Sequence, residues 1–180
     1  MIKLKNENSQ DAVVVILKET SIGVLLIAKS LKGICNIALG DTAEQLLQEL
    51  KICFTNVQSN IDDHILNREI AHIIAMVETP KLAEYCDLQL DIKGTAFQKK
   101  VWGALCEVQC GETISYKELA QHIGMPKAVR AVANACAHNK LALAIPCHRV
   151  IYTNGAIAGY RWGIQRKQTL LHREQQECFV

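Results

Sequence analysis

The chain has 180 residues, of which 49% are hydrophobic and 21% are charged. This balance suits one globular domain of average size or two small ones, and it excludes wholesale disorder. No stretch approaches about 18 consecutive apolar residues without a charge, so no membrane-spanning helix is expected. The first residues contain no apolar run of signal-peptide length, and we expect a cytoplasmic protein, or a nuclear one if its source has a nucleus.

The net charge of +2 conceals an uneven distribution along the chain. Residues 1–91 hold 8 basic and 13 acidic side chains, whereas residues 92–180 hold 12 basic and 5 acidic ones. A basic half joined to an acidic half is typical of a protein with one face that meets a polyanion such as nucleic acid. The alternative is that the cations only line a solvated surface, and charge alone does not separate the two.

The eight cysteines are predicted to be reduced thiols, because the chain carries no export signal. No pair has the C-x2-C spacing, and no compact cluster of cysteine and histidine offers the four ligands that zinc needs. We therefore expect no metal.

The first half predicts a small α/β unit. Its β-rich runs, which predict three antiparallel strands, cover residues 12–17, 22–28 and 34–39. Asp41 and Glu44 have the spacing of a capping box and predict a helix that begins there. A second helix is expected from Asp62 to Val77, and residues 88–92 predict a short strand at the end of the unit.

The second half predicts mostly helices. Thr95 with Gln98, and Ser115 with Glu118, are capping boxes for two of them. The second of these helices should end at Gly124, and another should run from Lys127 to about His138. Two short helices around a glycine-containing turn form a candidate helix-turn-helix, a geometry that also occurs in proteins that never touch DNA. We expect domains at residues 1–92 and 93–180.

The most pointed local feature is Pro146-Cys147-His148-Arg149-Val150. A free cysteine with a pKa near 8.5 is only about 3% thiolate at neutral pH, so a nucleophile needs assistance. Arg149 offers positive potential and His148 can accept a proton. If the segment is extended, adjacent side chains point to opposite sides, and a water is the natural relay between them. The alternative is a buried structural cysteine beside a surface histidine.

This pentapeptide resembles the active-site signature of the O6-alkylguanine-DNA alkyltransferases, also called methylated-DNA–protein-cysteine methyltransferases. The similarity extends from about Gly94 to Glu174 and is greatest to the C-terminal half of the bacterial adaptive-response Ada protein. The other segments that match in order and spacing are 94–98, 101–102, 111–116, 126–132 and 159–163. The chain lacks the four-cysteine N-terminal domain of that protein, so we expect no phosphotriester sensing or transcriptional activation.

The resemblance implies a fold and an activity. The fold would be an α/β N-terminal unit, ribonuclease H-like with a three-stranded antiparallel sheet, followed by a mostly α, winged-helix-like domain with the helix-turn-helix. The activity would be direct-reversal DNA repair, in which Cys147 takes an alkyl group irreversibly from O6 of guanine, and from O4 of thymine, in a single turnover. No cofactor is implied.

The resemblance also assigns catalytic roles by position. His148 would accept the Cys147 proton through a water, and Glu174 would support the imidazole. Tyr116 would help to rotate the nucleotide and supply a proton to the guanine that leaves. These roles are chemically reasonable, because a carboxylate behind an imidazole fixes its tautomer and stabilises its charged form.

The implied partner is double-stranded DNA, bound through the minor groove with weak sequence preference by a monomer, with no membrane involved. The alanine-rich helix with Ala128 and Ala131 would lie in the groove, and Arg130 would fill the space left by the extruded base. Asn139 would join this helix to the active-site segment through backbone hydrogen bonds.

The implied substrate pocket combines family features with two departures. The backbone carbonyls of Cys147 and Val150 would accept from the amino group of the base, and Tyr160 would close the pocket. Arg161 stands where some relatives have serine, and Trp162 stands where others have glycine. A bulky indole near the pocket mouth predicts poor reaction with large alkyl groups.

Three other functions stay open from the sequence. A non-catalytic protein could bind alkyl lesions and flag them for excision repair, although relatives of that kind carry another residue in place of Cys147. A Cys-His hydrolase would need an oxyanion hole and catalytic turnover. A helix-turn-helix regulator would normally need a dimerisation element, which we do not find in the sequence.

Overall fold

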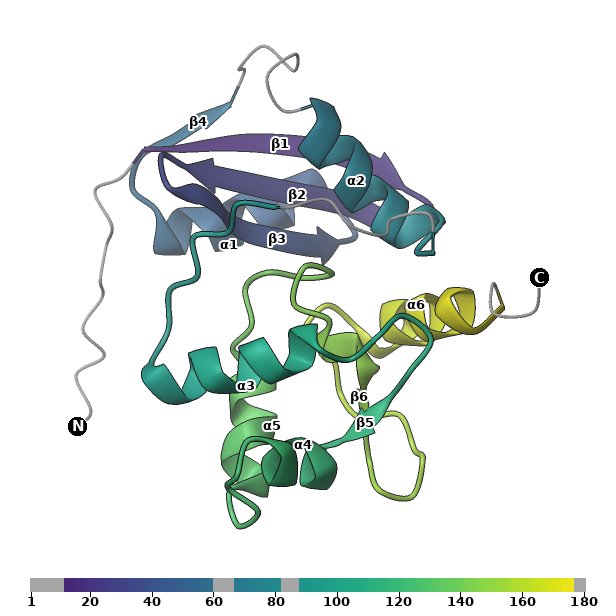
Figure 1. The fold of residues 1–180 in the computed structure, drawn as a ribbon. Helices are drawn as coiled ribbons and strands as arrows, with labels where there is room; N and C mark the ends of the chain where they lie inside the picture. The colour runs from purple at the N-terminus through teal and green to yellow at the C-terminus, as the bar shows by residue number, and fades with distance from the viewer. Residues whose placement is uncertain (1–11, 60–66, 82–87, 177–180) are drawn as a thin grey trace.

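The computed structural model describes residues 12–59, 67–81 and 88–176, in which a β-sheet unit precedes a mostly helical half (Figure 1). The sheet unit contains β1 (Val13–Thr20), β2 (Gly23–Ser30), β3 (Gly33–Gly40), α1 (Ala43–Cys53), β4 (Val57–Ser59) and α2 (Asn67–Glu78). The helical half contains α3 (Ala96–Cys106), β5 (Ile114–Ser115), α4 (Tyr116–His122), α5 (Val129–Ala137), the 3-10 turn η2 (Cys147–Arg149), β6 (Val150–Ile151) and α6 (Ile164–Gln176). The predicted α/β unit and mostly α second half are confirmed.

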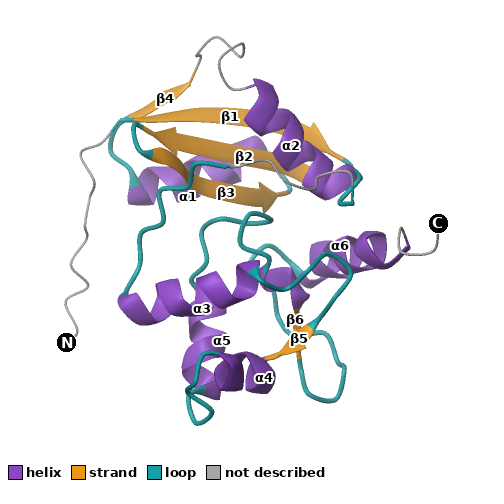
Figure 2. Ribbon diagram, in the orientation of Figure 1, coloured by secondary structure: helices purple, strands orange, loops and turns teal. Residues whose placement is uncertain are grey.

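The sheet has the strand order β3-β2-β1-β4. The three long strands are antiparallel, as predicted, and β4 adds a short strand parallel to β1. β4 has only three residues, too few to give a periodic pattern in the sequence. α1 and α2 lie on opposite faces of the sheet (Figure 2). The central strand β2 is therefore buried on both faces, which explains its nearly continuous apolar run.

Two apolar clusters fill the two faces of the sheet. On one face, Leu46 and Leu50 of α1 pack with Val13 and Leu26. On the other face, the cluster extends from the sheet through α2 and into the helical half. Its members include Leu25, Ile27, Ile37, Ile73, Val101, Leu119, Val132 and Leu170. The two halves thus share one hydrophobic core, and the division into domains at residue 92 stays a prediction.

The predicted start of α1 is wrong by one residue. Thr42, not Asp41, caps the helix: its backbone is extended and its hydroxyl accepts a hydrogen bond from the Gln45 N–H at 3.2 Å. The Asp41 carboxylate pairs instead with Arg166 of α6. A partner 125 residues away, which no local pattern reveals, decides which side chain is left to cap the helix.

Two other predicted elements differ in extent. The expected strand at residues 88–92 is a single bridge, in which Ile34 of β3 donates to Gln89 and accepts from Asp91. The second helix is described from Asn67 onward, so its expected first residues, 62–66, lie outside the described part of the chain.

The indole of Trp102 joins α3 to α5 within the helical half. The capping box of Thr95 and Gln98 is formed with both hydrogen bonds, as predicted. The Nε1–H of Trp102 donates to the backbone oxygen of Ala135 in α5 at 2.9 Å. A Cβ on Gly94 would lie 2.5 Å from the Trp102 ring, so only glycine allows the backbone to approach the indole so closely. These contacts fix the position of α5 relative to α3.

α4 and α5 form two short packed helices joined by residues 123–128. Ser115 and Glu118 make the predicted capping box, and Gly124 has a φ of +73°, which suits the end of a helix. α5 begins at Val129 rather than at the predicted Lys127. The reason is a turn after Pro126, in which the Ala128 N–H donates to Met125 at 2.8 Å and delays the first helical residue.

The edge strand β3 holds the segment that leads to Cys147. The Ile37 N–H donates to the backbone oxygen of Lys140, and the Ala142 N–H donates to that of Ile37, both at 2.9 Å. Two arginines of α6 add further ties, because Arg166 donates to the backbone oxygen of Ile22 and Arg173 to that of Val77. The sheet unit therefore acts as a frame for the site described next.

Candidate active site

Cys147 begins the turn η2 and is buried within the helical half. Its side chain is 6% exposed. The backbone N–H of Cys147 donates to Ile145 at 2.8 Å, and the residues 147–149 form a 3-10 turn rather than an extended strand. In an extended strand, the side chains of Cys147 and His148 would point to opposite sides. Because the segment is a 3-10 turn, that argument does not apply here.

Asn139 connects the end of α5 to the active-site segment. Its side chain is fully buried, its Oδ1 accepts from the Leu141 N–H at 2.8 Å, and its Nδ2 donates to the backbone oxygen of Ile145 at 2.9 Å. The same Nδ2 lies 3.2 Å from the Cys147 Sγ. Asn139 therefore both shapes the loop and places a hydrogen-bond donor on the sulfur.

The loop between Asn139 and Cys147 contains a strained residue. Leu143 is buried with a φ of +68°, in the left-handed region that leucine rarely adopts. Such a conformation costs on the order of 1–3 kcal/mol and persists only where the surroundings impose it. Here the hydrogen bonds of Asn139 and the contact with β3 impose it.

His148, Arg149 and Glu174 form a cluster in which the histidine and the glutamate are buried and the arginine is partly buried. The His148 Nε2 lies 2.8 Å from the Glu174 Oε1, with both side chains nearly inaccessible. The Arg149 guanidinium also donates to both oxygens of Glu174, and its Nη1 donates to the backbone oxygen of Val108. Arg149 is thus paired with Glu174, so it does not serve as the free positive charge for Cys147 that the sequence predicts.

Burial controls the protonation states in this cluster. It raises the pKa of the Cys147 thiol to about 11, an effect that the hydrogen bond from Asn139 and the charge of Lys167 oppose. Burial lowers the pKa of His148 against the opposing effect of Glu174. Burial would raise the pKa of Glu174, but the hydrogen bonds and charges of His148 and Arg149 lower it to about 2. At neutral pH, therefore, Cys147 is a thiol, His148 is a neutral imidazole and Glu174 is a carboxylate.

Two buried polar atoms have no hydrogen-bond partner among the described residues. They are the His148 Nδ1 and the Tyr160 hydroxyl. Because Nε2 of His148 faces Glu174, Nδ1 is the nitrogen left to accept a proton. Buried polar groups are nearly always satisfied in proteins, so these two atoms point to a place where water or a substrate makes hydrogen bonds.

Aromatic side chains line the same region. The Tyr160 and His148 rings are nearly perpendicular, with ring centroids 6.4 Å apart, and Trp162 packs against Tyr160 at 5.1 Å. Trp162 is buried, and it also lines a small cavity beside α1. Arg161 between them is exposed.

Tyr116 stands at the start of α4 and is partly buried. Its ring lies 6.0 Å from that of Tyr152. Burial, with smaller effects of Cys136, Tyr152 and Cys147, raises the pKa of Tyr116 to about 12, so the phenol keeps its proton and can act as a donor. The structure therefore places Tyr116 in the electrostatic environment of Cys147.

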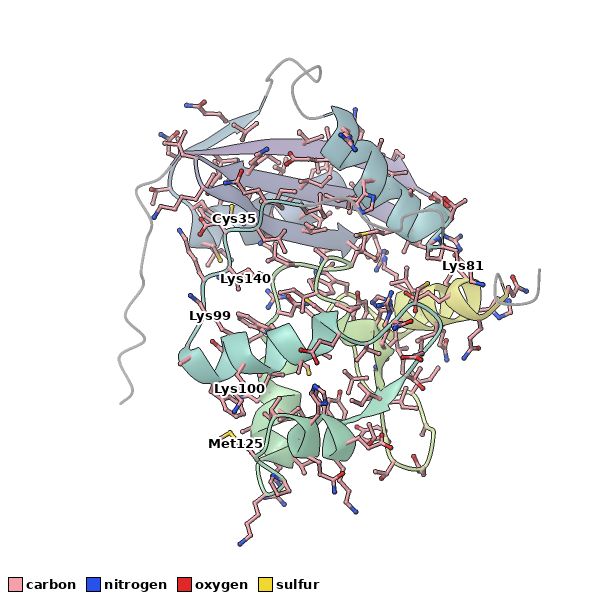
Figure 3. All side chains as sticks on the ribbon, viewed as in Figure 1. Cys35, Lys81, Lys99, Lys100, Met125 and Lys140 are labelled. Atoms are coloured by element: carbon pink, nitrogen blue, oxygen red, sulfur yellow. The ribbon has the colours of Figure 1, made fainter. Side chains whose placement is uncertain are left out.

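α5 presents an exposed, basic face. Arg130 and Ala131 are exposed, Ala128 caps the helix and is half-buried, and Lys127 precedes it in the turn. Lys100 of α3 and Met125 lie on the same side of the helical half as this turn (Figure 3). Small residues and cations on one face allow a close approach to an anionic surface.

One charged residue near the site escaped the sequence analysis. Lys167 is fully buried, and its Nζ donates to the backbone oxygen of Val150. A signal for it exists in the sequence: Lys167 and Glu174 share the helical spacing of Leu170 and Leu171, so both charges occupy the apolar face of α6.

The described residues contain neither a metal site nor a membrane-spanning helix. No group of three or more histidine, cysteine, aspartate or glutamate side chains in this part of the chain could hold a metal ion. No helix within it is long and apolar enough to cross a membrane.

Comparison with known proteins identifies the family. Residues 96–176 match the family model "6-O-methylguanine DNA methyltransferase, DNA binding domain". A methylated-DNA–protein-cysteine methyltransferase of the yeast Kluyveromyces lactis is 38% identical over 171 residues, which cover 84% of this chain and 90% of the yeast protein. The chain belongs to the O6-alkylguanine-DNA alkyltransferase family.

Other similarities of this chain agree. The crystal structure of Mycobacterium tuberculosis OGT in complex with DNA superposes with a TM-score of 0.72 at 31% identity, covering 92% of this chain and 93% of that one. The bifunctional transcriptional activator/DNA repair enzyme Ada of Escherichia coli is 48% identical over 161 residues, which are 88% of this chain. The match covers 44% of Ada, so this chain spans less than half the length of that relative.

Proposed function

We propose that this alkyltransferase repairs DNA by direct reversal, moving a methyl group from O6 of guanine to Cys147 in a single turnover. One observation carries the proposal above all. The Cys147 thiol is buried next to a histidine whose Nε2 is held by Glu174 and whose Nδ1 is free to accept a proton. An inert structural cysteine would need no such arrangement.

The atoms and electrons of the proposed step balance without a cofactor. The Cys147 proton passes through a water to Nδ1 of His148 as Sγ attacks the methyl carbon. The S–C bond forms while the C–O6 bond breaks, and its electron pair stays on the guanine. The Tyr116 hydroxyl supplies a proton to the guanine, and the proton held by His148 restores the phenol. The products are guanine and a thioether, which is not readily cleaved, so each molecule acts once.

The DNA must deliver its base into the protein for this reaction. The target nucleotide leaves the duplex, at a cost of a few kcal/mol in lost stacking and pairing. We place α5 in the minor groove, with Ala128 and Ala131 against the groove wall and Arg130 in the space left by the base. Tyr160 would close the pocket over the base, whose amino group would meet the carbonyls of Cys147 and Val150. We propose a monomer that acts where the DNA is, in the cytoplasm or in a nucleus.

A mapping experiment tests the proposal. The protein is incubated with excess duplex that contains O6-methylguanine, digested and analysed by mass spectrometry. We expect a gain of one methyl group, on the Cys147 peptide alone, with one guanine restored per protein molecule. Tight binding with an unmodified Cys147 would favour a lesion-flagging protein instead, and repeated turnover would contradict the single-use chemistry.

Binding to DNA is expected to depend strongly on salt and weakly on sequence. Contacts with phosphates release counterions, and each contact adds about one to the slope of log affinity against log salt. Lys127→Ala should lower that slope by about one, measured by fluorescence anisotropy on a duplex. Lys51→Ala in the last turn of α1, within the acidic half, is the matched control and should leave the slope unchanged. Binding that is insensitive to salt would contradict the basic-face proposal.

O6-Benzylguanine is expected to react at least about tenfold more slowly than a methylated duplex. A rate difference of this size is typical when a substrate group does not fit its pocket. The reason is that the buried Trp162 indole packs against Tyr160 and restricts the movement of its ring. The rates are compared by the loss of free Cys147. Trp162→Gly should narrow the difference, with thermal melting used to confirm that the variant is folded. Equal rates in the unmodified protein would count against this explanation.

A further inference from the structure

Tyr152, directly after β6, is a large aromatic side chain that is 51% exposed. Single exposed apolar side chains are common and need no explanation by themselves. Tyr152 is distinguished by its neighbour, because its ring lies 6.0 Å from the ring of Tyr116, with an angle of 59° between the two planes. Tilted rings with centroids about 4.5–7 Å apart attract each other. The two tyrosines therefore form an aromatic pair.

The backbone holds both tyrosines in fixed places. β5 and β6 pair in parallel and end at opposing residues, so Tyr116 and Tyr152 are the next residues on the two chains. Ser115 forms the capping box with which α4 begins at Tyr116. The Tyr152 N–H donates to the Ala156 carbonyl, and the Tyr152 carbonyl accepts from the Gly155 N–H, both at 2.9 Å. A closed turn, rather than a free loop, therefore presents the Tyr152 ring to Tyr116.

Packing alone orients the Tyr116 ring in the described part of the chain. No hydrogen bond of its hydroxyl is found among the described residues. The ring packs against the shared hydrophobic core, to which Tyr152 does not belong, so it is held between that core and the Tyr152 ring. Burial is the main reason that the pKa of Tyr116 rises to about 12. Removal of the Tyr152 ring would expose the phenol to water and give it room to turn.

We propose that Tyr152 is a positioning residue of the transfer reaction, whose ring holds the Tyr116 phenol in the orientation from which it gives its proton to the guanine. This inference rests on the proposed function. Tyr152 forms no covalent bond and gives up no proton, and the proton that reaches the guanine still leaves the Tyr116 hydroxyl. A proton donor is efficient only within hydrogen-bond reach of its acceptor, so a phenol that is free to turn loses part of its effect.

The alternative role for Tyr152 is a contact with the DNA alone, through the exposed part of its ring. The two roles change different quantities. A DNA contact changes the affinity for the duplex, because an aromatic ring can stack on a base. Orientation of Tyr116 changes the rate of transfer within the bound complex, and it does so only while the Tyr116 hydroxyl is present. Affinity, rate and dependence on that hydroxyl therefore separate the two roles.

The test is a double-mutant cycle on the two tyrosines. Tyr152→Ala removes the ring and Tyr152→Phe keeps it, and each is also made together with Tyr116→Phe. Leu31→Ala, at an exposed side chain between β2 and β3, is the distant control. Methyl transfer from O6-methylguanine duplex is followed in single turnover over a range of duplex concentrations, which gives the Kd and the rate at saturation separately. Thermal melting confirms that each variant is folded.

Tyr152→Ala should slow the rate at saturation by about three- to tenfold, the range for loss of an aromatic pair, and leave the Kd nearly unchanged. Tyr152→Phe and Leu31→Ala should react at the normal rate. In the Tyr116→Phe background, Tyr152→Ala should have little further effect, because no hydroxyl is left to orient. Equal slowing in both backgrounds, or a change in Kd alone, would overturn the inference.

A measurement without DNA reads the ring directly. The four tyrosines of the chain are labelled in their rings for NMR, and Tyr116→Phe identifies the Tyr116 signals. In Tyr152→Ala, the contacts between the Tyr116 ring and the methyl groups of the core should weaken, and unchanged contacts would contradict the positioning role. An unmodified protein that takes up no methyl group from DNA would refute the proposed function instead, whatever the NMR contacts show.

Discussion

Replacement of Cys147 by serine is expected to end alkyl removal from DNA. A hydroxyl is a far weaker nucleophile than a thiolate, and neither His148 nor Lys167 can compensate for its much higher pKa. The substitution is nearly isosteric, and serine retains an acceptor for the Asn139 Nδ2, so folding and DNA binding should persist. Loss of methyl from a labelled duplex measures the effect, with thermal melting and anisotropy as checks on the fold and on binding.

A second cysteine supplies the control for that experiment. Cys53→Ser in α1 alters a partly exposed thiol near Lys140, which lies between the sheet and the helical half (Figure 3). It should remove methyl groups at the normal rate. Undiminished repair by Cys147→Ser would refute the proposed reaction, because no other described thiol has the same neighbours.

Glu174→Gln is expected to lower both stability and the transfer rate. Glutamine has nearly the same shape as Glu174, but it leaves the partly buried Arg149 charge without its carboxylate partner and weakens the hydrogen bond to His148. Disruption of a buried ion pair in this way typically costs about 3–5 kcal/mol of unfolding free energy, which urea denaturation measures. Transfer should slow by at least about tenfold, because general-base assistance from a positioned histidine contributes more than that.

The pH dependence gives this prediction a further check. The folded-state pKa of Glu174 is about 2, below its ordinary value of 4.5, because His148 and Arg149 outweigh the effect of burial. The stability from this shift is present above pH 4.5 and is lost as the pH falls toward 2. The difference in unfolding free energy between the unmodified protein and Glu174→Gln should therefore become smaller over that pH range. Glu112→Gln, at an exposed carboxylate, is the control. A difference in unfolding free energy that stays constant with pH would show that the lost stability does not come from the charge of Glu174.

Local patterns in the sequence determined the elements that depend on a few neighbouring residues. The capping boxes at Thr95 and Ser115 place the starts of α3 and α4 correctly, because their hydrogen bonds span three residues. The alternation and apolar runs of β1 to β3 likewise predict three antiparallel strands. Where a distant partner takes part, the same reasoning is wrong: Asp41 pairs with Arg166, and Thr42 caps α1 instead.

The motif around Cys147 identified the reactive segment, but it did not reveal the environment of the thiol. Sequence position alone suggested that Arg149 acts on Cys147, whereas the fold pairs Arg149 with Glu174 and buries Lys167 against the Val150 carbonyl. These residues come from separate elements, and their burial follows from how α6 packs against η2. Short-range patterns determined which residues form helices and strands. Only tertiary packing decided which charges are buried together, because burial and distance set their protonation states.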